Sequence, residues 1–419
     1  MPPKSTRTYH DPLHGAITLH LRDPVEALLV RLIDTPPFQR LRRIRQLGPA
    51  SLTFHGAESS RFTHALGVMA LARRAFERLV RRHPSLAEHR AALLCAALLH
   101  DIGHGPFSHT AEEVFHTHHE HWTQRIIRES DAIAPLLRGH DPGLVDAIAA
   151  IYTHDHSVPL IWQLVSSQLD CDRLDYLLRD SYFTGASYGH LDLERILNAL
   201  DWDPTTGGLV IAQKGQAAVE HYLLVRYLMY AQVYNHPKNL AATWVLQRAF
   251  ERARHHLQAN NLEADETVTT WLRQPSTTWS LATYLAADDI VFTYHLHRWQ
   301  HHTDPILADL CRRFLDRDLF KARDISHLSP SEQQQLLDDL RQILVHQGTD
   351  PAIYSGLRQS HSRGYTLYQR GIQVRVESAS RDINAVSPLV EPLTRAYQRT
   401  WLIYPAPLSE WLSDRLATR

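Results

Sequence analysis

The stretch "RAALLCAALLHDIGHGPFSH", residues 90–109, joins an apolar segment to a polar one. The segment that follows Arg90 is apolar on nearly every side of a helix, which predicts a central, fully buried helix. The second half places three histidines and an aspartate among glycines, a mixture that core packing does not require. A helix that stops at Gly103 would leave these polar side chains at the inner end of a buried helix.

His100 and Asp101 stand at this predicted helix end. Burying an unpaired carboxylate beside an imidazole costs free energy, and a divalent cation that coordinates both removes that cost. Adjacent helical residues point about 100° apart, so two adjacent ligands imply that the helix ends or distorts there. An isolated pair would be explained more simply by a capping carboxylate and a histidine bonded to a carbonyl. The nearby His104 and His109 favour the metal.

Further candidate ligands lie in two other predicted helices. "THALGVMALARRAFERLVRRH" begins with His64 close to Arg61, and "SQLDCDRLDYLLRDSYFTG" carries several aspartates. In the second helix, Arg173, Tyr176 and Asp180 share one face, with Asp172 at its edge. For these residues the spacing alone leaves a ligand site and a salt-bridged helix open. For Asp175 and Arg179 we favour an ordinary ion pair within the helix.

The composition predicts a soluble, cytoplasmic protein with a large core. Of 419 residues, 44% are hydrophobic and 21% charged, and 44 basic residues balance 45 acidic ones, so the global basic excess of a nucleic-acid binder is absent. Three isolated cysteines favour a reducing compartment without a thiolate metal cluster. The first residues lack the apolar core of a signal peptide, and no apolar run approaches the roughly 20 residues that span a bilayer.

The chain divides into a mostly α-helical core, about residues 1–320, and a small α/β subdomain, residues 321–419. In the core we expect a hairpin at "HDPLHGAITLH", two helices separated at Pro36 and Pro37, a strand at "GGLVIA" and a helix at "EHYLLVRYLMYAQVYNH". In the subdomain, "YTLYQRGIQVRVES" and "RTWLIYP" predict strands, and "SPSEQQQLLDDLRQILVH" and "LSEWLSDRLAT" predict helices.

Four motifs, taken in order, resemble those of the HD-domain phosphohydrolases: "RFTHALGV", "LLHDIGHGPFSH", "HHEHWTQRII" and "LDCDRLDYLLRDSYFTG". Their order and spacing are similar to those of the deoxynucleoside triphosphate (dNTP) triphosphohydrolase branch, over roughly the first three quarters of the chain. The resemblance implies an HD-domain helical core and a homo-oligomer, dimer or tetramer. It also implies a metal-dependent enzyme that cleaves a dNTP to a deoxynucleoside and inorganic triphosphate. Lowering the dNTP pool could serve nucleotide balance or antiviral defence against phage.

The resemblance also assigns the metal and catalytic residues. The ligands of one divalent metal, for which Mn, Fe, Ni, Co and Zn all suit the mixed N/O donor set, are His64, His100, Asp101 and Asp172. The inner catalytic residues are His104, His109, Glu112, His119 and Glu120. His109 is the candidate general acid or water-aligning group, with Glu112 or Glu120 orienting its ring. Glu112 stands where the family relative has Asp. A Mg²⁺ ion would arrive with the substrate triphosphate.

Substrate and effector residues follow from the same resemblance. The triphosphate clamp comprises Arg61, Arg173, Tyr176 and Arg226, with Arg173 replacing a lysine and so changing the geometry of the contact. The deoxyribose is surrounded by Gln46, Leu47, Asp180, Tyr230 and Tyr234. An activating nucleotide would contact Asp34, Gln39 and Arg42 between subunits. From the residues alone, a capping aspartate and a solvated basic face explain these three slightly better.

Three alternatives remain at this point. An HD phosphodiesterase or 5′-nucleotidase would share the metal ligands but need fewer cations, and the several arginines favour a triphosphate. A nucleotide-sensing regulatory protein would keep the fold without turnover, whereas every ligand position here is filled. Nucleic acid is not expected as a partner, because the basic segments "RLRRIRQ" and "RRAFERLVRRH" lie on amphipathic helices and are typical of solvated faces.

Overall fold

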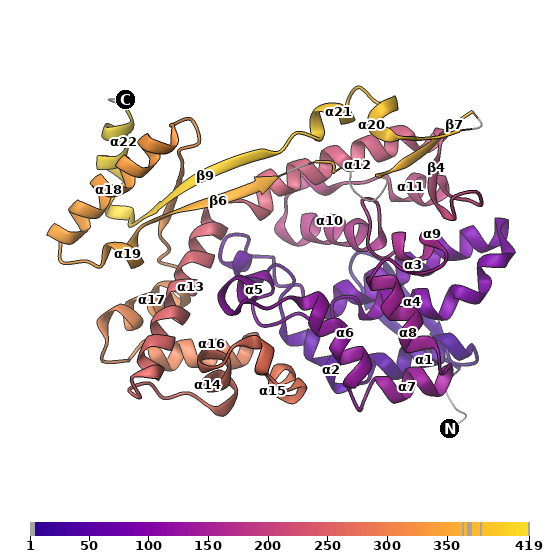
Figure 1. Cartoon of the computed structure of the whole chain (residues 1–419), viewed down its shortest axis with the longest axis horizontal. Helices are drawn as coiled ribbons and strands as arrows, with labels where there is room; N and C mark the ends of the chain where they lie inside the picture. Colours follow the sequence, from indigo (N-terminus) through magenta and orange to yellow (C-terminus); the bar gives the residue numbers. More distant parts are fainter. Residues whose placement is uncertain (1–4, 363, 367–370, 378, 418–419) are drawn as a thin grey trace.

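The computed structural model describes residues 5–362, 364–366, 371–377 and 379–417. Helices make up most of it, with three small sheets between and beside them (Figure 1). The predicted mostly α fold class is confirmed, as is the mixed helix-and-strand character of the C-terminal part. No helix among the described residues combines the length and the apolar character that crossing a membrane requires.

The core is built around one apolar helix, α4 (Arg90–Leu99), and every side chain from Leu93 to Leu99 is completely buried. It packs against α1 (Pro24–Ile33), α3 (Arg61–Arg82) and α8 (Leu144–Tyr152), as its all-round apolar sequence predicts. The helix ends at Leu99, earlier than expected, so Gly103 is not its stop signal. A Cβ atom at Gly103 would lie 2.1 Å from the His119 carbonyl oxygen, and glycine is required for this close approach.

The N-terminal hairpin has the predicted form. Strands β1 (Thr6–Asp11) and β2 (Gly15–His20) pair antiparallel, and Gly15 takes the positive φ of +70° that the turn requires. After α1, the helix α2 (Pro36–Arg40) starts at the proline pair, because proline is tolerated in the first turn of a helix. The predicted division into two helices is therefore confirmed.

A second group of helices packs behind the polar stretch 100–109. The long α13 (Pro237–Gln258) runs through it, against α17 (Pro305–Leu315) and α5 (His109–Phe115). Helix α10 (Cys171–Thr184) returns to α3, and α12 (Gln216–Met229) continues into a π-helical turn, η6 (Tyr230–Tyr234). The remaining helices before residue 300 are α6 (His119–Glu129), α7 (Ala134–His140), α9 (Pro159–Gln163), α11 (Leu193–Ala199), α14 (Glu266–Arg273), α15 (Leu281–Leu285) and α16 (Asp289–Trp299).

Two sheets connect the C-terminal part to the core. The first contains β3 (Leu200–Asp203), β4 (Gly208–Ala212), β7 (Gln373–Val376) and β8 (Ala379–Asp382), and β4 and β7 are parallel. Strands from both sides of residue 320 therefore share one sheet, while the domain boundary there stays a prediction. The predicted strand 365–378 is observed as β7, and its residues 367–370 and Ser378 lie outside the described residues.

The second sheet forms a long arm that reaches back over the helices (Figure 1). Strand β9 (Tyr397–Tyr404) lies between β5 (Lys321–Asp324) and β6 (Gly356–Ser362), antiparallel to both. The helices of this part are α18 (Pro330–His346), α19 (Pro351–Tyr354), α20 (Ile383–Val386), α21 (Val390–Leu393) and α22 (Ser409–Ala417). Strand β6 places C-terminal residues against helices α5 and α13, which lie beside the polar stretch 100–109.

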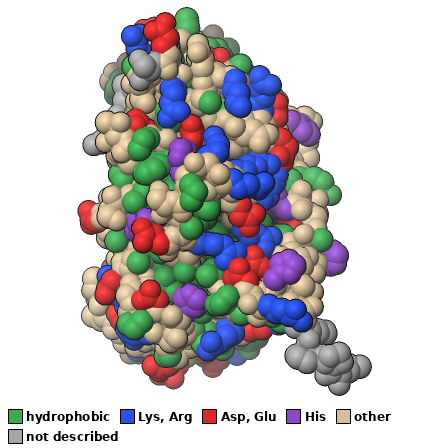
Figure 2. Space-filling view, turned by 90° about the vertical axis from the view of Figure 1, so that its right-hand side faces the viewer, with side chains coloured by type: hydrophobic (Ala, Val, Ile, Leu, Met, Phe, Trp, Pro, Cys, Tyr) green, Lys and Arg blue, Asp and Glu red, His purple; other side chains and the backbone are tan. Residues whose placement is uncertain are grey.

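The surface supports the solvated-face interpretation for the segment "RRAFERLVRRH" only. In "RLRRIRQ", Arg40 is buried and donates to the Ala287 and His104 carbonyl oxygens, so the interpretation is wrong for this residue. On the face shown in Figure 2, Lys and Arg side chains are interspersed with Asp and Glu. In the segment "RRAFERLVRRH", Arg74 and Arg78 both pair with Glu194, and Arg82 pairs with Asp201. These arginines are therefore neutralised by carboxylates of neighbouring elements.

Candidate active site

Four predicted ligands, from α3, from the turn after α4 and from α10, lie close together. The Nε2 atom of His64 in α3 lies 3.2 Å from the Nε2 atom of His100, which follows α4. The same His64 atom lies 3.7 Å from Asp101 Oδ2 and 3.0 Å from Asp172 Oδ1 of α10. His100 Nε2 lies 3.4 Å from Asp101 Oδ1 and 3.6 Å from Asp172 Oδ1. His64, His100 and Asp101 thus offer ligand atoms that all lie within 4.8 Å of one another, and Asp172 Oδ1 lies 3.0 and 3.6 Å from the two ring nitrogens.

The far nitrogen of each ligating ring is held by an acceptor. His64 Nδ1 lies 2.7 Å from Asp175 Oδ2, and His100 Nδ1 lies 2.9 Å from the Ala97 carbonyl oxygen. With a metal ion bound, each Nδ1 would carry the proton and each Nε2 would present its lone pair to the ion. Lone pairs placed this close together repel unless a cation or a proton lies between them. This donor set fits a divalent transition metal.

The electrostatics of the centre lead to the same conclusion. Burial alone would lower the pKa of His64, but hydrogen bonds with Asp172 and Asp175 outweigh it and raise this pKa to about 10. Burial would raise the pKa of Asp172, but its hydrogen bonds with His100 and His64 hold it below the usual range. The carboxylates thus attract positive charge strongly, which protons or a metal ion can supply.

Asp175 is the centre's main outer support. It is fully buried, and besides His64 it contacts His14 Nε2 at 2.5 Å and Arg179 Nε at 2.7 Å. Arg179 also donates to Asp11 Oδ2 at 2.8 Å. The expected Asp175–Arg179 ion pair is confirmed, and it is part of a larger buried network that orients His64. The N-terminal hairpin, which supplies Asp11 and His14, thereby braces the centre.

The predicted inner residues form a second cluster beside the first. His104 Nε2 lies 3.3 Å from Asp101 Oδ1, and the His104 ring stacks on His119 with centroids 3.9 Å apart. Glu112 contacts the Nδ1 atoms of both His109 and His119 at 2.6 Å. Burial, and then the charges of Arg61 and His119, hold the pKa of His104 well below its usual value, so this ring is neutral.

Glu112 rather than Glu120 holds the His109 ring. Glu120 instead lines a cavity of about 100 Å³ with His100, Asp101 and Asp172. His109 begins helix α5, and its side chain is two-thirds exposed. Its Nδ1 is occupied by the Glu112 carboxylate, which leaves Nε2 of an accessible ring for proton transfer.

The backbone that precedes His109 is strained. Phe107 and Ser108 have positive φ angles of 56° and 55°, which side chains with a Cβ atom rarely adopt. The turn is held because Phe107 N donates to Asp289 Oδ1 at 2.7 Å and Ser108 Oγ donates to the Arg45 carbonyl at 2.7 Å. Such strain is typical of functional sites and here fixes the direction of the His109 helix.

The predicted substrate residues of α10 and α12 are also brought together. Tyr234 Oη donates to Asp180 Oδ2 at 2.8 Å, and its ring contacts those of Tyr176 and Tyr230. Tyr230 and Tyr234 lie in the π-helical turn η6, a distortion that is frequent at functional sites. Within the described residues, the buried Asp180 Oδ1 has no hydrogen-bond partner. An acceptor is thus left for a ligand hydroxyl.

The predicted clamp arginines are held by neighbours. Arg61 Nη1 donates to Asp101 Oδ2 at 2.5 Å, Arg173 pairs with Asp170, and Arg226 Nη1 donates to Gln168 Oε1 at 2.9 Å. The Nε atoms of Arg173 and Arg226 are buried and have no hydrogen-bond partner in the described part of the chain. Two cationic donors thus remain for an anion.

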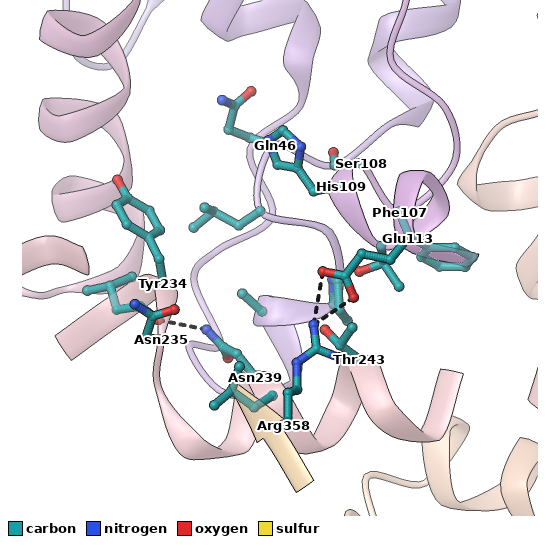
Figure 3. Close-up of a pocket in the computed structure, with 16 residues that line it drawn as sticks. Gln46, Phe107, Ser108, His109, Glu113, Tyr234, Asn235, Asn239, Thr243 and Arg358 are labelled. Carbon is teal, nitrogen blue, oxygen red and sulfur yellow. Dashed lines mark hydrogen bonds and ion pairs between the residues drawn. The ribbon is translucent and has the colours of Figure 1, made fainter. Parts of the chain in front are cut away.

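Gln46 and Leu47 line another cavity, of about 230 Å³, together with His109 and Tyr234 (Figure 3). It adjoins the inner cluster because His109 belongs to both. The wall opposite the cluster comes from η6, α13 and strand β6 of the C-terminal arm. The predicted deoxyribose residues Gln46, Leu47 and Tyr234 therefore face one space.

Comparisons with known proteins agree with this geometry. The HD domain family matches residues 61–179, and the HD associated region matches residues 191–343. An uncharacterized protein of Bacillus subtilis, YwfO, is 38% identical over 366 residues, 87% of this chain and 82% of its own length. The chain belongs to the HD-domain family.

More distant relatives of this HD-domain protein include named enzymes. The human deoxynucleoside triphosphate triphosphohydrolase SAMHD1 is 31% identical over 229 residues, 46% of this chain and 35% of the human protein. A crystal structure of a phosphohydrolase from Bacteroides thetaiotaomicron superimposes with a TM-score of 0.82 at 28% identity, covering 95% of this chain and 99% of that one. The family resemblance predicted from the four motifs is confirmed.

Neighbouring side chains and carbonyl groups hold the three candidate effector residues of the HD-domain protein. Asp34 accepts two hydrogen bonds from Arg7, at 2.7 and 2.9 Å, and Gln39 donates to the Ile33 carbonyl. Arg42 donates to Gln39 and lies over the Phe62 ring at 3.6 Å. Arg42 lines a cavity of about 510 Å³, whose lining residues do not include Asp34 or Gln39. Their effector role stays a prediction.

Several residues of the site were missed in the sequence. His14 and Asp11 lie in a hairpin more than 150 positions from α10, and Gln168 lies in a loop before it. Asp175 had a usable signal, because it follows Asp172 by three positions and so lies on the same helix face. The others carry no local pattern that distinguishes them from ordinary polar residues.

Proposed function

We propose that this HD-domain protein is a metal-dependent dNTP triphosphohydrolase, which cleaves a dNTP to a deoxynucleoside and inorganic triphosphate. One observation carries the proposal: the inner cluster is continuous with both the metal centre and the Gln46–Leu47 cavity. His104 contacts the metal-centre residue Asp101, and His109 lines the cavity. A substrate with its sugar in the cavity would present its α-phosphate to the cluster.

The residues of the centre would hold one divalent transition metal: His64, His100, Asp101 and Asp172. Such an ion supplies Lewis-acid chemistry toward a phosphoryl oxygen. A water molecule would attack the α-phosphorus as the bond to the 5′ oxygen breaks, and its proton would pass to solvent. His109, with Nδ1 engaged by Glu112, would give a proton from Nε2 to the leaving 5′ oxygen. His119 contacts the same Glu112 carboxylate and stacks on the His104 ring. These contacts fix the relative positions of the histidines in the inner cluster.

The cationic donors around the centre support a triphosphate rather than a monophosphate. The Nε groups of Arg173 and Arg226, which have no partner among the described residues, would stabilise charge on the phosphates, with Tyr176 beside them. Mg²⁺ would accompany the substrate's phosphates. The free oxygen of Asp180, next to Tyr234, would accept a hydrogen bond from a sugar hydroxyl.

We extend the proposal to assembly and activation. A homo-oligomer would place Asp34, Gln39 and Arg42 near a second subunit, where a nucleotide could bind and activate. The enzyme names of the vertebrate relatives support the substrate class.

A product assay tests the proposal directly. Purified protein is mixed with Mn²⁺ or Mg²⁺ and with each dNTP, singly and in pairs, and the products are separated by ion exchange. Deoxynucleoside together with intact triphosphate supports the proposal, and activity only with pairs supports nucleotide activation. Survival of every dNTP while a cyclic or monophosphorylated nucleotide is hydrolysed overturns the substrate class and favours the phosphodiesterase alternative.

A further inference from the structure

An ion pair from distant parts of the chain forms one wall of the cavity in Figure 3. Arg358 Nη2, on strand β6, donates to both carboxylate oxygens of Glu113, on helix α5, at 2.7 and 2.9 Å. Both residues line the same cavity as His109 and Tyr234. The hydrogen bonds of Arg358 to other described residues all start from Nη2, so its remaining N–H groups are left for a ligand.

The strand fixes Arg358 in place. A Cβ atom at Gly356 would lie 2.2 Å from the Trp244 ring, so β6 rests directly on α13. Trp244 Nε1 donates to the Ile353 carbonyl at 3.0 Å, just before the strand. Arg358 is opposite Trp401 in the sheet. A side chain on a strand that is held this closely can read a ligand with more precision than one on a loop.

The lining of the cavity suits a flat ligand with a polar edge. Gln46 Oε1 and Asn239 Oδ1 are buried acceptors, and neither has a partner in the part of the chain that the structure describes. Asn239 Nδ2 donates to the Val233 carbonyl at 2.8 Å, which sets the orientation of the amide. Apolar side chains, among them Pro49, Val233 and Leu240, also line the cavity. A nucleobase has this character, with apolar faces and hydrogen-bonding edges.

We propose that Arg358 and Glu113 read the edge of the substrate's nucleobase and favour guanine. This inference rests on the proposed function, which places the reacting phosphate at His109 and the sugar at Gln46 and Tyr234, with the base beyond. Guanine offers two acceptors, O6 and N7, to a guanidinium and two adjacent donors, N1–H and N2–H, to a carboxylate. Because O6 adjoins N1, an arginine and a glutamate in contact can meet both edges together.

The first experiment measures kcat/KM for the four dNTPs with the wild type, Arg358→Met and Glu113→Gln. We expect the wild type to prefer dGTP, and each variant to lower the ratio of dGTP to dTTP about tenfold or more, since a bidentate base contact contributes that much discrimination. The matched control is Arg415→Met, which breaks an arginine–aspartate pair with Asp339 away from the cavity and should leave the ratios unchanged.

A charge swap separates base reading from a structural role. Glu113→Arg combined with Arg358→Glu keeps an ion pair between α5 and β6, so thermal stability should remain close to that of the wild type. If the pair is only structural, the swapped variant keeps the wild-type ratios of kcat/KM among the four dNTPs. If the pair reads the base, the swapped variant loses the preference for dGTP.

Two outcomes overturn the inference while the proposed function stands. One is hydrolysis of dNTPs by the wild type without preference for dGTP. The other is a set of base ratios in all three variants within twofold of the wild type. If the wild type cleaves no dNTP at all, the proposed function fails first, and the inference falls with it.

Discussion

The metal centre and the substrate cavity are adjacent, but they are built in different ways. The centre takes its ligands from α3, from the end of α4 and from α10, helices of one continuous core, and its outer support Asp175 is fully buried. The cavity takes its lining from α5, α13, η6 and strand β6, and its Arg358–Glu113 wall is partly exposed.

This difference separates chemistry from recognition. A centre in which both ligating imidazoles are held from behind by Asp175 and the Ala97 carbonyl is preorganised, so its geometry follows from the packing of the core. The cavity combines two helices, a π-helical turn and a strand from separate parts of the chain, so single substitutions there can change one part of its lining. Substitutions in the centre should therefore remove activity, whereas substitutions in the cavity should redistribute it among substrates.

The largest effect is expected at Asp101, which belongs to the centre. Asp101→Ala should abolish both metal retention and turnover, because the ion loses a ligand and the inner cluster loses its contact with the centre. Metal content by mass spectrometry and dNTP hydrolysis measure the two effects. Asp146→Ala, an exposed carboxylate on α8, is the control. Retained turnover in a metal-free Asp101 variant would contradict the mechanism.

Asp175 tests whether the buried network sets the affinity of the centre. Asp175→Asn keeps the shape but weakens the hold on His64 Nδ1, and we expect metal affinity to fall about 10–100-fold. Competition with a chelator measures this affinity. Asp304→Asn breaks a comparable aspartate–arginine pair outside the site and should leave the affinity unchanged. Equal affinities in the two variants would show that Asp175 is only structural.

Arg226 lies on α12, outside the cavity lining, and tests the predicted phosphate clamp. Arg226→Ala should raise KM for a dNTP about 10–100-fold, the range expected for a lost hydrogen bond to a charged group, while the metal stays bound. Initial rates over a range of dNTP concentrations, with metal analysis of the same sample, measure both. Arg128→Ala, at an exposed ion pair with Asp146, serves as the control. Unchanged kinetics would remove Arg226 from the clamp.

Asp180 is expected to give the smallest effect, seen in the pH dependence of stability. Burial raises its pKa to about 7, so near pH 5 the folded protein holds a proton that the unfolded chain has lost. The stability from this proton is lost as the pH rises through 7. Between pH 5 and pH 8, the wild type should lose on the order of 1–2 kcal/mol relative to Asp180→Asn, which imitates the protonated form. Urea unfolding of both proteins at pH 5 and pH 8 measures this. An equal change in the free energy of unfolding for the wild type and Asp180→Asn would contradict the prediction.

Much of the fold and of the centre could be predicted from local patterns. The apolar run of α4 predicted a buried central helix, and the proline pair predicted the division between α1 and α2. His64, His100, Asp101 and Asp172 were expected as ligands, and the structure brings them together. The stop at Gly103 was wrong, because the need for glycine there comes from the approach of His119, a contact that no local pattern shows.

By itself, the sequence determined the helical core, the HD-domain family and the chemical types gathered at residues 100–109, because periodicity and motif spacing are properties of short segments. Only the tertiary structure decided that Glu112 rather than Glu120 holds His109, that the hairpin residue His14 braces Asp175, and that Arg358 meets Glu113 at the cavity. Arg358 and Glu113 stand 245 positions apart, and the packing of the C-terminal arm on α13 brings them together.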